Sequence, residues 1–276
     1  MEISMKQPHY KALALDLDGT LTNSHKEIPL QNKEAIWKAI DRGVTVILAS
    51  GRAPMGMTGL AKELELDRRG GIIAAFNGGK IIDCTTGKAI VNYELPHELI
   101  PSICRIAAKH HTAPVSYTDT HVVSEYDTDP YVLLECKCNG TTVQKVDNLP
   151  EFLDFPVNKL MIAGEHERLL KVRDEMLSLY GDRMVSFFSE SFFLEASPVG
   201  VGKDKAMEAI CKHLNITKDD LMVCGDGLND IPMFDFSGFS VAMKNAYPET
   251  AAHADVVVPK TNDECGVAFA IENYLL

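Results

Sequence analysis

The feature that most constrains the fold of this chain is a series of short, almost entirely apolar segments that alternate with amphipathic ones. The apolar runs of strand length are residues 12–17, 44–49, 72–76, 221–224, 239–241 and 256–258. The segments typical of amphipathic helices are residues 30–41, 55–64, 203–214, 229–236 and 263–275. Strands that are apolar on both faces are typical of parallel sheets covered by helices on each side. The alternation therefore predicts an α/β fold with a doubly wound parallel sheet.

The middle of the chain, from residue 83 to residue 192, departs from this alternation. Its predicted strands are residues 89–93, 117–124, 159–163 and 184–188, and its predicted helices are residues 96–109 and 169–180. Helices and short strands that do not strictly alternate indicate an α+β unit. We therefore predict a discontinuous core domain, residues 1–82 and 193–276, with a second domain, residues 83–192, inserted into it.

Composition excludes several classes of partner and of protein. The chain has 276 residues and a formal net charge of −12, whereas a nucleic-acid or anionic membrane surface calls for a basic face. No apolar run approaches the roughly 18–20 residues that span a bilayer, and residues 1–11 lack the apolar core of a signal peptide. The seven cysteines are an odd number and are expected to be reduced thiols. We expect a cytoplasmic monomer or small homo-oligomer that binds neither nucleic acid nor membrane.

The strongest chemical signal is the hexapeptide D-L-D-G-T-L, residues 16–21, directly after the first apolar run. A carboxylate is costly at the end of a buried strand unless it is paired or binds a cation. The carboxyl ends of parallel strands are also where open α/β sheets bind ligands. Residues i and i+2 of an extended segment point the same way, so Asp16 and Asp18 can address one site. Taken alone, the motif leaves an ordinary Asp-Gly turn open as an alternative.

Two weaker signals involve hydroxyl and ammonium groups. The run at 44–49 is followed by Ser50 and Gly51, and a hydroxyl with free backbone N–H groups at such a turn suits a phosphate oxygen. Lys203 opens a predicted helix after a loop that contains glycine. Each has an ordinary alternative, a simple Ser-Gly turn in one case and a solvated lysine in the other.

The fourth signal is G-D-G-L-N-D, residues 225–230, which follows the run at 221–224. It adds Asp226 and Asp230 to the sheet edge that carries Asp16. Carboxylates gathered there would repel one another by roughly several kcal/mol without a cation. Oxygen-only ligands with open positions suit Mg²⁺. The sequence therefore predicts a magnesium site at this edge.

In this order, the four signals resemble the motifs of the haloacid dehalogenase (HAD) superfamily of phosphatases. The place of the inserted segment, together with Asn77-Gly78-Gly79 just before it, resembles the Cof-type subfamily with a class IIB α/β cap. The resemblance covers essentially the whole chain. It implies a Rossmann-like core and a cap, residues 83–192, that selects the substrate.

The resemblance also implies catalytic and phosphate-binding roles. Asp16 would be the nucleophile that forms an aspartyl-phosphate. Asp18 would be the general acid that protonates the leaving oxygen and then the base that activates water. Ser50 would bind the phosphoryl group together with Gly51, and Lys203 would offset its charge and restrain Asp16.

The same resemblance implies the metal site. Mg²⁺ would be held by a carboxylate oxygen of Asp16, the backbone carbonyl of Asp18 and the side chain of Asp226. Asp230 would support the metal shell, either directly or through water. Asn229 would contact the phosphate or orient Lys203.

These roles imply a Mg²⁺-dependent phosphoric monoester hydrolase that acts on small phosphorylated metabolites, with sugar phosphates as the first expectation. A phosphomutase or phosphotransferase of the same superfamily uses the same pair of aspartates and Mg²⁺, and stays open. A non-catalytic phosphometabolite sensor also stays open, although such a protein could lose Asp16, Asp18, Lys203 or Asp226. Haloalkanoate dehalogenases lack the second aspartate of D-x-D, so Asp18 disfavours that activity.

Overall fold

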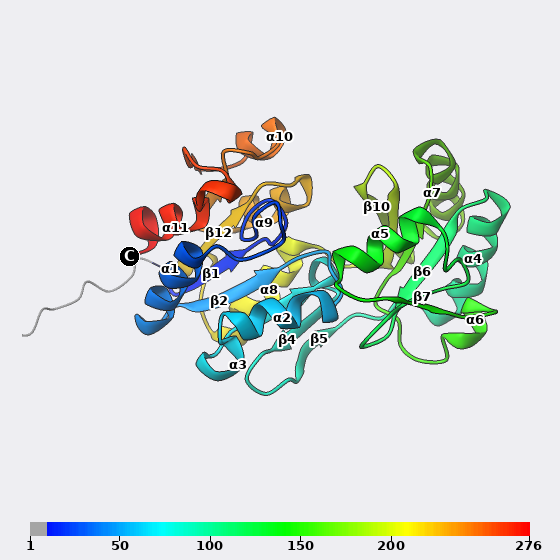
Figure 1. Ribbon diagram of the computed structural model, residues 1–276, viewed down its shortest axis with the longest axis horizontal. Coiled ribbons are helices and arrows are strands. Elements are labelled where there is room, and N and C mark those ends of the chain that lie inside the picture. Colours follow the sequence, from blue (N-terminus) through cyan, green and yellow to red (C-terminus); the bar gives the residue numbers. More distant parts are fainter. Residues whose placement is uncertain (1–9) are drawn as a thin grey trace, which may run out of the picture. The chain divides into compact units, whose positions relative to one another are not determined.

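The computed structural model describes residues 10–276, which divide into two compact units (Figure 1). The first unit comprises the residues up to Ser50, Thr58–Val91 and Gly202–Leu276, and the second comprises Gly51–Met57 and Asn92–Val201. The boundaries predicted at 83 and 192 both fall earlier than this division. The strand at residues 89–92 belongs to the sheet of the first unit, and the strand at residues 193–198 belongs to the sheet of the second.

An eight-stranded sheet with the order β14-β13-β12-β1-β2-β3-β4-β5 forms the described part of the first unit. The strands from β14 to β3 are parallel neighbours, and β4 pairs antiparallel with β3. This arrangement confirms the predicted α/β class and parallel sheet. The strands are β1 (Ala12–Leu15), β2 (Thr45–Ala49), β3 (Ile72–Ala75), β4 (Lys80–Asp83), β5 (Ala89–Asn92), β12 (Leu221–Gly225), β13 (Phe239–Ala242) and β14 (Val256–Val257).

Both faces of the central strands are buried, as their apolar sequences require. Ala14, Ile47 and Val223 belong to one hydrophobic cluster with residues of α8 and α9. Leu13 and Leu48 alternate to the other face and are equally buried. The helices are α1 (Leu30–Asp41), α2 (Met55–Glu63), α3 (Leu66–Arg69), α8 (Lys203–Leu214), α9 (Ile231–Phe236), α10 (Pro248–Ala252) and α11 (Gly266–Ala270).

Two of the predicted helices of the first unit are shorter than their patterns suggest. The segment predicted at 229–236 begins with a 3₁₀ turn at Leu228–Asp230, and α9 starts only at Ile231, followed by a proline. The segment predicted at 263–275 is divided by Cys265, whose φ of 63° lies in the left-handed region. A left-handed residue ends a regular helix, which hydrophobic periodicity alone does not reveal.

The second unit has a six-stranded sheet with the order β10-β11-β9-β6-β7-β8, antiparallel except for the β7–β8 pair. Helices α4 and α7 contribute Ile103 and Val172 to the cluster that covers one face of this sheet, where Leu160 and Leu194 are buried. The strands are β6 (Ala113–Tyr117), β7 (Val122–Ser124), β8 (Val143–Lys145), β9 (Leu160–Ala163), β10 (Met184–Glu190) and β11 (Phe193–Pro198); the helices are α4 (Ile100–Lys109), α5 (Pro130–Cys138), α6 (Leu149–Phe152) and α7 (His166–Tyr180).

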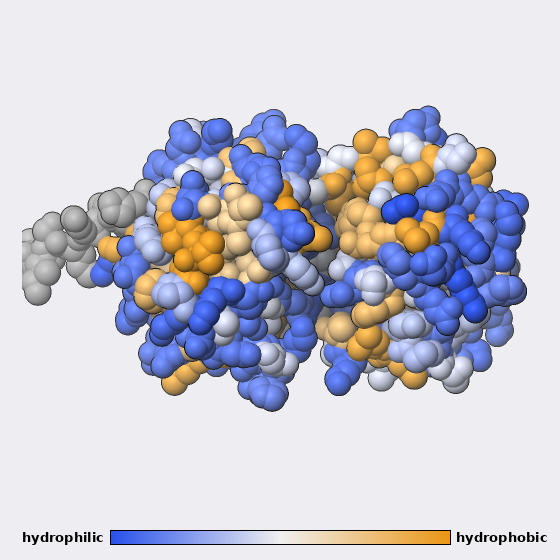
Figure 2. Space-filling model, turned by 90° about the horizontal axis from the view of Figure 1, so that it is seen from above, coloured by the Kyte–Doolittle hydropathy of each residue, from blue (hydrophilic) through white to orange (hydrophobic). Residues whose placement is uncertain are grey.

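Hydrophilic side chains cover much of the face drawn in Figure 2, with apolar residues scattered among them. Within residues 10–276 none of the helices has the length and apolarity that crossing a membrane requires. The expectation about residues 1–11 falls mostly on residues 1–9, which lie outside the described residues. The seven cysteines carry free thiols, as predicted.

Candidate active site

Asp16 directly follows β1 and is 6% exposed. Its backbone N–H donates to the carbonyl of Cys224 at 3.0 Å, so the chain continues in register with β12. The backbone N–H of Leu21 in turn donates to the Asp16 carbonyl at 3.2 Å, which closes the D-L-D-G-T-L loop. The end of the central strand therefore holds this carboxylate in a buried and well-defined position.

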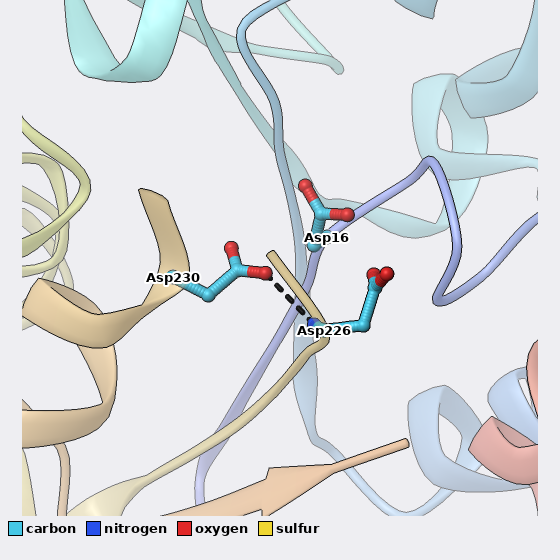
Figure 3. Close-up of side chains that lie close together, drawn as sticks. All are labelled: Asp16, Asp226 and Asp230. Atoms are coloured by element: carbon cyan, nitrogen blue, oxygen red, sulfur yellow. Dashed lines mark hydrogen bonds between the residues drawn. The ribbon is translucent and has the colours of Figure 1, made fainter. Parts of the chain in front are cut away.

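The loop after β12 wraps around the carboxylate of Asp230. One oxygen, Oδ2, accepts the backbone N–H groups of Asp226 at 2.9 Å and Gly227 at 2.8 Å; Figure 3 shows the first of these bonds. A Cβ at Gly225 would lie 2.5 Å from this oxygen. The glycine at the end of the strand is thus required by the close approach of Asp230.

Lys203, the first residue of α8, lies between two of the acids. Its Nζ is 2.6 Å from Oδ1 of Asp16 and 2.5 Å from Oδ1 of Asp230, and the residue is 2% exposed. Carboxylate oxygens of Asp16, Asp226 and Asp230 all lie within 4.8 Å of one another (Figure 3). The cluster thus contains three acids and one ammonium group, which leaves it with an excess of negative charge when all three acids are ionised.

Burial is the main cause of the pKa shifts of the acids in this cluster, and repulsion between the acids adds to it. Burial raises the pKa of Asp16 well above its usual range, although Lys203 opposes the shift. Burial likewise raises the pKa of Asp226 to about 6, against the effect of the Thr20 hydroxyl, which donates to its Oδ1 at 2.6 Å. Burial disfavours the charge of Lys203, but Asp16 and Asp230 outweigh it and raise the pKa of the ammonium group. A further cation at the acids would stabilise their ionised forms.

The residues present fit a hard divalent cation. They offer closely spaced carboxylate oxygens, the donor type that Mg²⁺ prefers. The backbone at Gly19 approaches Asp226 closely. The φ of Gly19 is +82°, and a Cβ at this position would lie 2.2 Å from Oδ2 of Asp226. Only a glycine therefore fits at this position of the loop. Asp230 accepts two backbone N–H groups at 2.9 and 2.8 Å and the ammonium group of Lys203 at 2.5 Å, whereas the oxygens of Asp226 accept from the Thr20 hydroxyl at 2.6 Å and, over a long 3.4 Å, from Nδ2 of Asn245. Asp16 and Asp226 are therefore better placed than Asp230 to ligate the cation directly.

Asp18 lies outside the cluster of three acids. Its side chain is 37% exposed, and its Oδ1 accepts from Nζ of Lys26 at 2.6 Å. Lys26 has a φ of 65° in the loop after the motif. Sequence reasoning did not select this lysine as a site residue, because its approach depends on the left-handed turn rather than on any spacing.

The predicted phosphate-binding residues are distributed over both units. Ser50, at the end of β2, is buried, and its carbonyl accepts the backbone N–H of Asn77 at 2.8 Å. Asn229 donates from Nδ2 to Oδ1 of Asn77 at 3.2 Å. Gly51 belongs to the second unit, where its carbonyl accepts from Nζ of Lys159 at 3.0 Å. Asn77, which the sequence suggested only as a mark of the subfamily, is thus a direct neighbour of two predicted site residues.

Comparison with known proteins identifies the family. A family model described as haloacid dehalogenase-like hydrolase matches residues 13–271. The chain therefore belongs to the haloacid dehalogenase-like hydrolases. A crystal structure of a hydrolase of this description from Bacteroides thetaiotaomicron is 36% identical, with a TM-score of 0.91 over 95% of this chain and 98% of that one. Within the family the chain is a Cof-type HAD hydrolase, and its enzyme class is that of the phosphoric monoester hydrolases.

Other relatives agree in length and fold. The 5-amino-6-(5-phospho-D-ribitylamino)uracil phosphatase YwtE of Bacillus subtilis is 27% identical over 301 residues, covering 96% of this chain and 98% of that protein. The structure of the HAD subclass IIB sugar phosphatase BT4131 shares the fold, with 22% identity, a TM-score of 0.80 and coverage of 96% and 98%. The chain spans only 48% of a further relative, the chloroplastic endoribonuclease YBEY of Arabidopsis thaliana, at 26% identity over 99% of this chain.

Proposed function

We propose that this hydrolase is a Mg²⁺-dependent phosphatase that cleaves small phosphorylated metabolites through an aspartyl-phosphate at Asp16. The observation that carries the proposal is the position of Lys203 Nζ, 2.6 Å from Asp16 and 2.5 Å from Asp230, inside a cluster that also contains Asp226. A carboxylate that attacks a phosphate dianion meets repulsion, and fixed positive charge is what lowers that barrier.

The reaction divides into two displacements. An oxygen of Asp16 bonds to phosphorus while the bond from phosphorus to the leaving oxygen breaks, and Asp18 gives that oxygen its proton. Asp18 then takes a proton from a water molecule, whose oxygen attacks phosphorus and releases inorganic phosphate and the free Asp16 carboxylate. Two steps allow one carboxyl group to act first as acid and then as base. The partial exposure of Asp18 supports this role, because the group must exchange protons with solvent and leaving group.

The metal requirement follows from the surplus of acids. Asp16 and Asp226 would hold Mg²⁺ with the backbone carbonyl of Asp18, and Asp230 would orient the loop and Lys203. When bound, the cation would supply charge neutralisation for the phosphoryl group and for the nucleophile. Ser50, Gly51 and Asn229 are proposed to bind the phosphoryl oxygens.

The proposed substrates are sugar phosphates and related phosphomonoesters. The support comes from two relatives, since YwtE is named for a phosphorylated ribityl compound and BT4131 for sugar phosphates. We propose that the second unit selects the leaving group.

A screen of phosphorylated metabolites tests the proposal. The protein is incubated with p-nitrophenyl phosphate and a panel of sugar phosphates in Mg²⁺ or in EDTA, and free phosphate is measured. We expect release with Mg²⁺, none in EDTA, and none from Asp16→Asn, whereas Asp182→Asn, at an exposed position, keeps full activity.

The alternatives give different products in the same screen. An isomerised sugar phosphate without free phosphate would indicate a phosphomutase, and transfer to a second alcohol would indicate a phosphotransferase. Binding of phosphorylated compounds without turnover of any of them would indicate a sensor and contradict the phosphatase proposal.

A further inference from the structure

The turn after β3 joins two predicted phosphate-binding residues of the first unit. The backbone N–H of Asn77 donates to the carbonyl of Ser50 at 2.8 Å, which fixes the end of β2 against the end of β3. The side-chain Oδ1 of Asn77 accepts from Nδ2 of Asn229 at 3.2 Å. One residue thus holds the main chain of Ser50 and the side chain of Asn229.

The same turn packs against the start of α8, the helix that begins with Lys203. At Gly78, where φ is +97°, a Cβ would lie 2.7 Å from Cβ of Ala206 and 3.0 Å from the carbonyl of Gly202. No larger residue fits at this contact, so the turn is held directly beside the helix end that supplies the ammonium group.

The second amide atom of Asn77, Nδ2, has no hydrogen-bond partner among residues 10–276. Asn77 is 3% exposed, and its Nδ2 makes no hydrogen bond within the described residues. A buried amide donor without an acceptor destabilises the folded protein. Nδ2 is bonded to the same carbon as the oxygen that contacts Asn229, so it lies beside that residue. The unpaired donor is therefore part of a residue that contacts two of the residues proposed to bind phosphate.

We propose that Asn77 is a further phosphate-binding residue, which donates a hydrogen bond from Nδ2 to an oxygen of the phosphoryl group; this inference rests on the proposed phosphatase function. A phosphoryl group offers only acceptor oxygens, which is what the unpaired donor lacks. A carboxamide suits the position because it accepts from Asn229 at one end and donates to the anion at the other. A carboxylate or an aliphatic side chain could not do both.

Two variants test the role of the Asn77 side chain separately from that of its backbone hydrogen bond. Asn77 has a φ of 54°, a conformation that glycine adopts without strain, so Asn77→Gly keeps the turn and the backbone bond to Ser50 but removes the carboxamide. Asn77→Asp keeps an acceptor for Asn229 and replaces the donor with a negative charge. The matched control is Asn215→Gly, an exposed residue at the end of α8 with a φ of 53°.

The measurements are KM, kcat and the inhibition constant of inorganic phosphate. For Asn77→Gly we expect the inhibition constant and KM to rise about 10–100-fold, the effect of losing a hydrogen bond to a charged group, and for Asn77→Asp we expect a larger rise. Asn215→Gly should match the wild type in all three, and the Mg²⁺ concentration for half-maximal activity should change in none of the variants.

The outcomes distinguish this inference from the phosphatase proposal. Wild-type protein that hydrolyses phosphomonoesters, with Asn77→Gly and Asn77→Asp unchanged in KM and phosphate inhibition, would overturn the role of Asn77 alone. Wild-type protein that releases no phosphate would overturn the proposed function. In that case calorimetric binding of inorganic phosphate still tests Asn77, since equal affinity of wild type and Asn77→Asp would contradict the contact.

Discussion

Each unit of the molecule buries a lysine against carboxylates, but the two clusters differ in how their charges are balanced. In the first unit, Lys203 faces Asp16 and Asp230, and Asp226 lies within the same group. In the second unit, Lys159 is 1% exposed and its Nζ is 3.1 Å from Oε1 of Glu195. A buried lysine is therefore not by itself a mark of catalysis.

Neutral donors and acceptors distinguish the second cluster. Nζ of Lys159 also donates to the carbonyl of Gly51 at 3.0 Å and lies 5.3 Å from the ring centre of Tyr117. Oε1 of Glu135 accepts from the hydroxyl of Tyr117 at 2.8 Å and from Nδ2 of Asn139 at 2.7 Å. Uncharged protein groups thus contact Lys159 and Glu135, whereas Oε2 of Glu195 is buried without a hydrogen-bond partner among residues 10–276. We expect this cluster to have a structural role.

The acids of the first cluster instead depend on added positive charge. Asp16 and Asp230 share one ammonium group, and the pKa of Asp16 is raised by burial. Such a surplus is costly in a protein that only needs to fold, but it is useful where a cation and a phosphoryl group must be held together. The comparison predicts that changes in the first cluster affect turnover and changes in the second affect stability.

The largest expected effect is that of Lys203→Met. The substitution keeps most of the length of the side chain but removes the charge between Asp16 and Asp230, so we expect kcat to fall by at least about 10⁴-fold. Steady-state kinetics with p-nitrophenyl phosphate measures it. Lys159→Met, assayed below its unfolding temperature, should stay within about tenfold of wild type per folded molecule. Equal losses of kcat in Lys203→Met and Lys159→Met would contradict the predicted difference between the two clusters.

Lys159→Met should produce the largest loss of stability. The substitution leaves the carboxylate of Glu195 buried without its cation. Removing one partner of a buried ion pair lowers the free energy of unfolding by about 3–5 kcal/mol. Urea unfolding followed by circular dichroism measures this. The control is Lys145→Met, which removes an ion pair with Asp127 whose lysine side chain is 58% exposed and should cost less than about 1 kcal/mol. A double variant, Lys159→Met with Glu195→Gln, should recover part of the loss, and no recovery would argue against the pair as its source.

Asp226→Asn should alter the metal requirement. Replacing a ligand carboxylate by an amide removes a charge that the cation needs, so we expect the Mg²⁺ concentration for half-maximal activity to rise about 10–100-fold. A Mg²⁺ titration of phosphatase activity measures the shift. Glu195→Gln, its counterpart in the second cluster, should leave the Mg²⁺ titration unchanged. A shift of similar size in Glu195→Gln would mean that the two clusters are not distinct in function.

The smallest expected effect concerns pH and Glu135. Burial raises the pKa of this carboxyl group above its ordinary value of 4.5, so the folded state keeps its proton to higher pH than the unfolded state does. The contribution of Glu135 to wild-type stability should therefore decline as the pH rises above about 4.5 and level off above the raised pKa. Glu135→Gln should lack this decline, so its stability relative to wild type should be greater at neutral pH than at acidic pH. Parallel stability curves for the two proteins would contradict the shift.

The sequence predicted the first cluster better than the second for a physical reason. Asp16 directly follows the strand β1, and Asp226 and Asp230 lie in the loop that follows the apolar run at 221–224. Parallel strands bring their carboxyl ends to one edge whatever the order of the strands. The ammonium group of Lys203 was predicted through the family resemblance, and the structure brings it to these acids. The roles assigned to these residues stay predictions.

The second cluster depends on contacts that no local pattern reveals. Lys159 precedes β9, and Glu195 lies within β11 opposite Met161. Their approach requires the antiparallel register of β9 and β11, and long-range register is not encoded in spacing along the chain. The predicted boundary at residue 83 lies before β5, whose place beside β4 in the first sheet is likewise a long-range pairing that spacing along the chain does not encode.

The most direct test of the central claim is to trap the covalent intermediate. The Asp18→Asn variant is mixed with p-nitrophenyl phosphate and Mg²⁺, quenched in acid and reduced with borohydride, which converts an aspartyl-phosphate to homoserine. Tandem mass spectrometry then locates the change. Because p-nitrophenol leaves without a proton, the first step should proceed while hydrolysis is slowed, so we predict homoserine at position 16. Release of p-nitrophenol with no modification at Asp16, or with modification at another residue, would contradict the account.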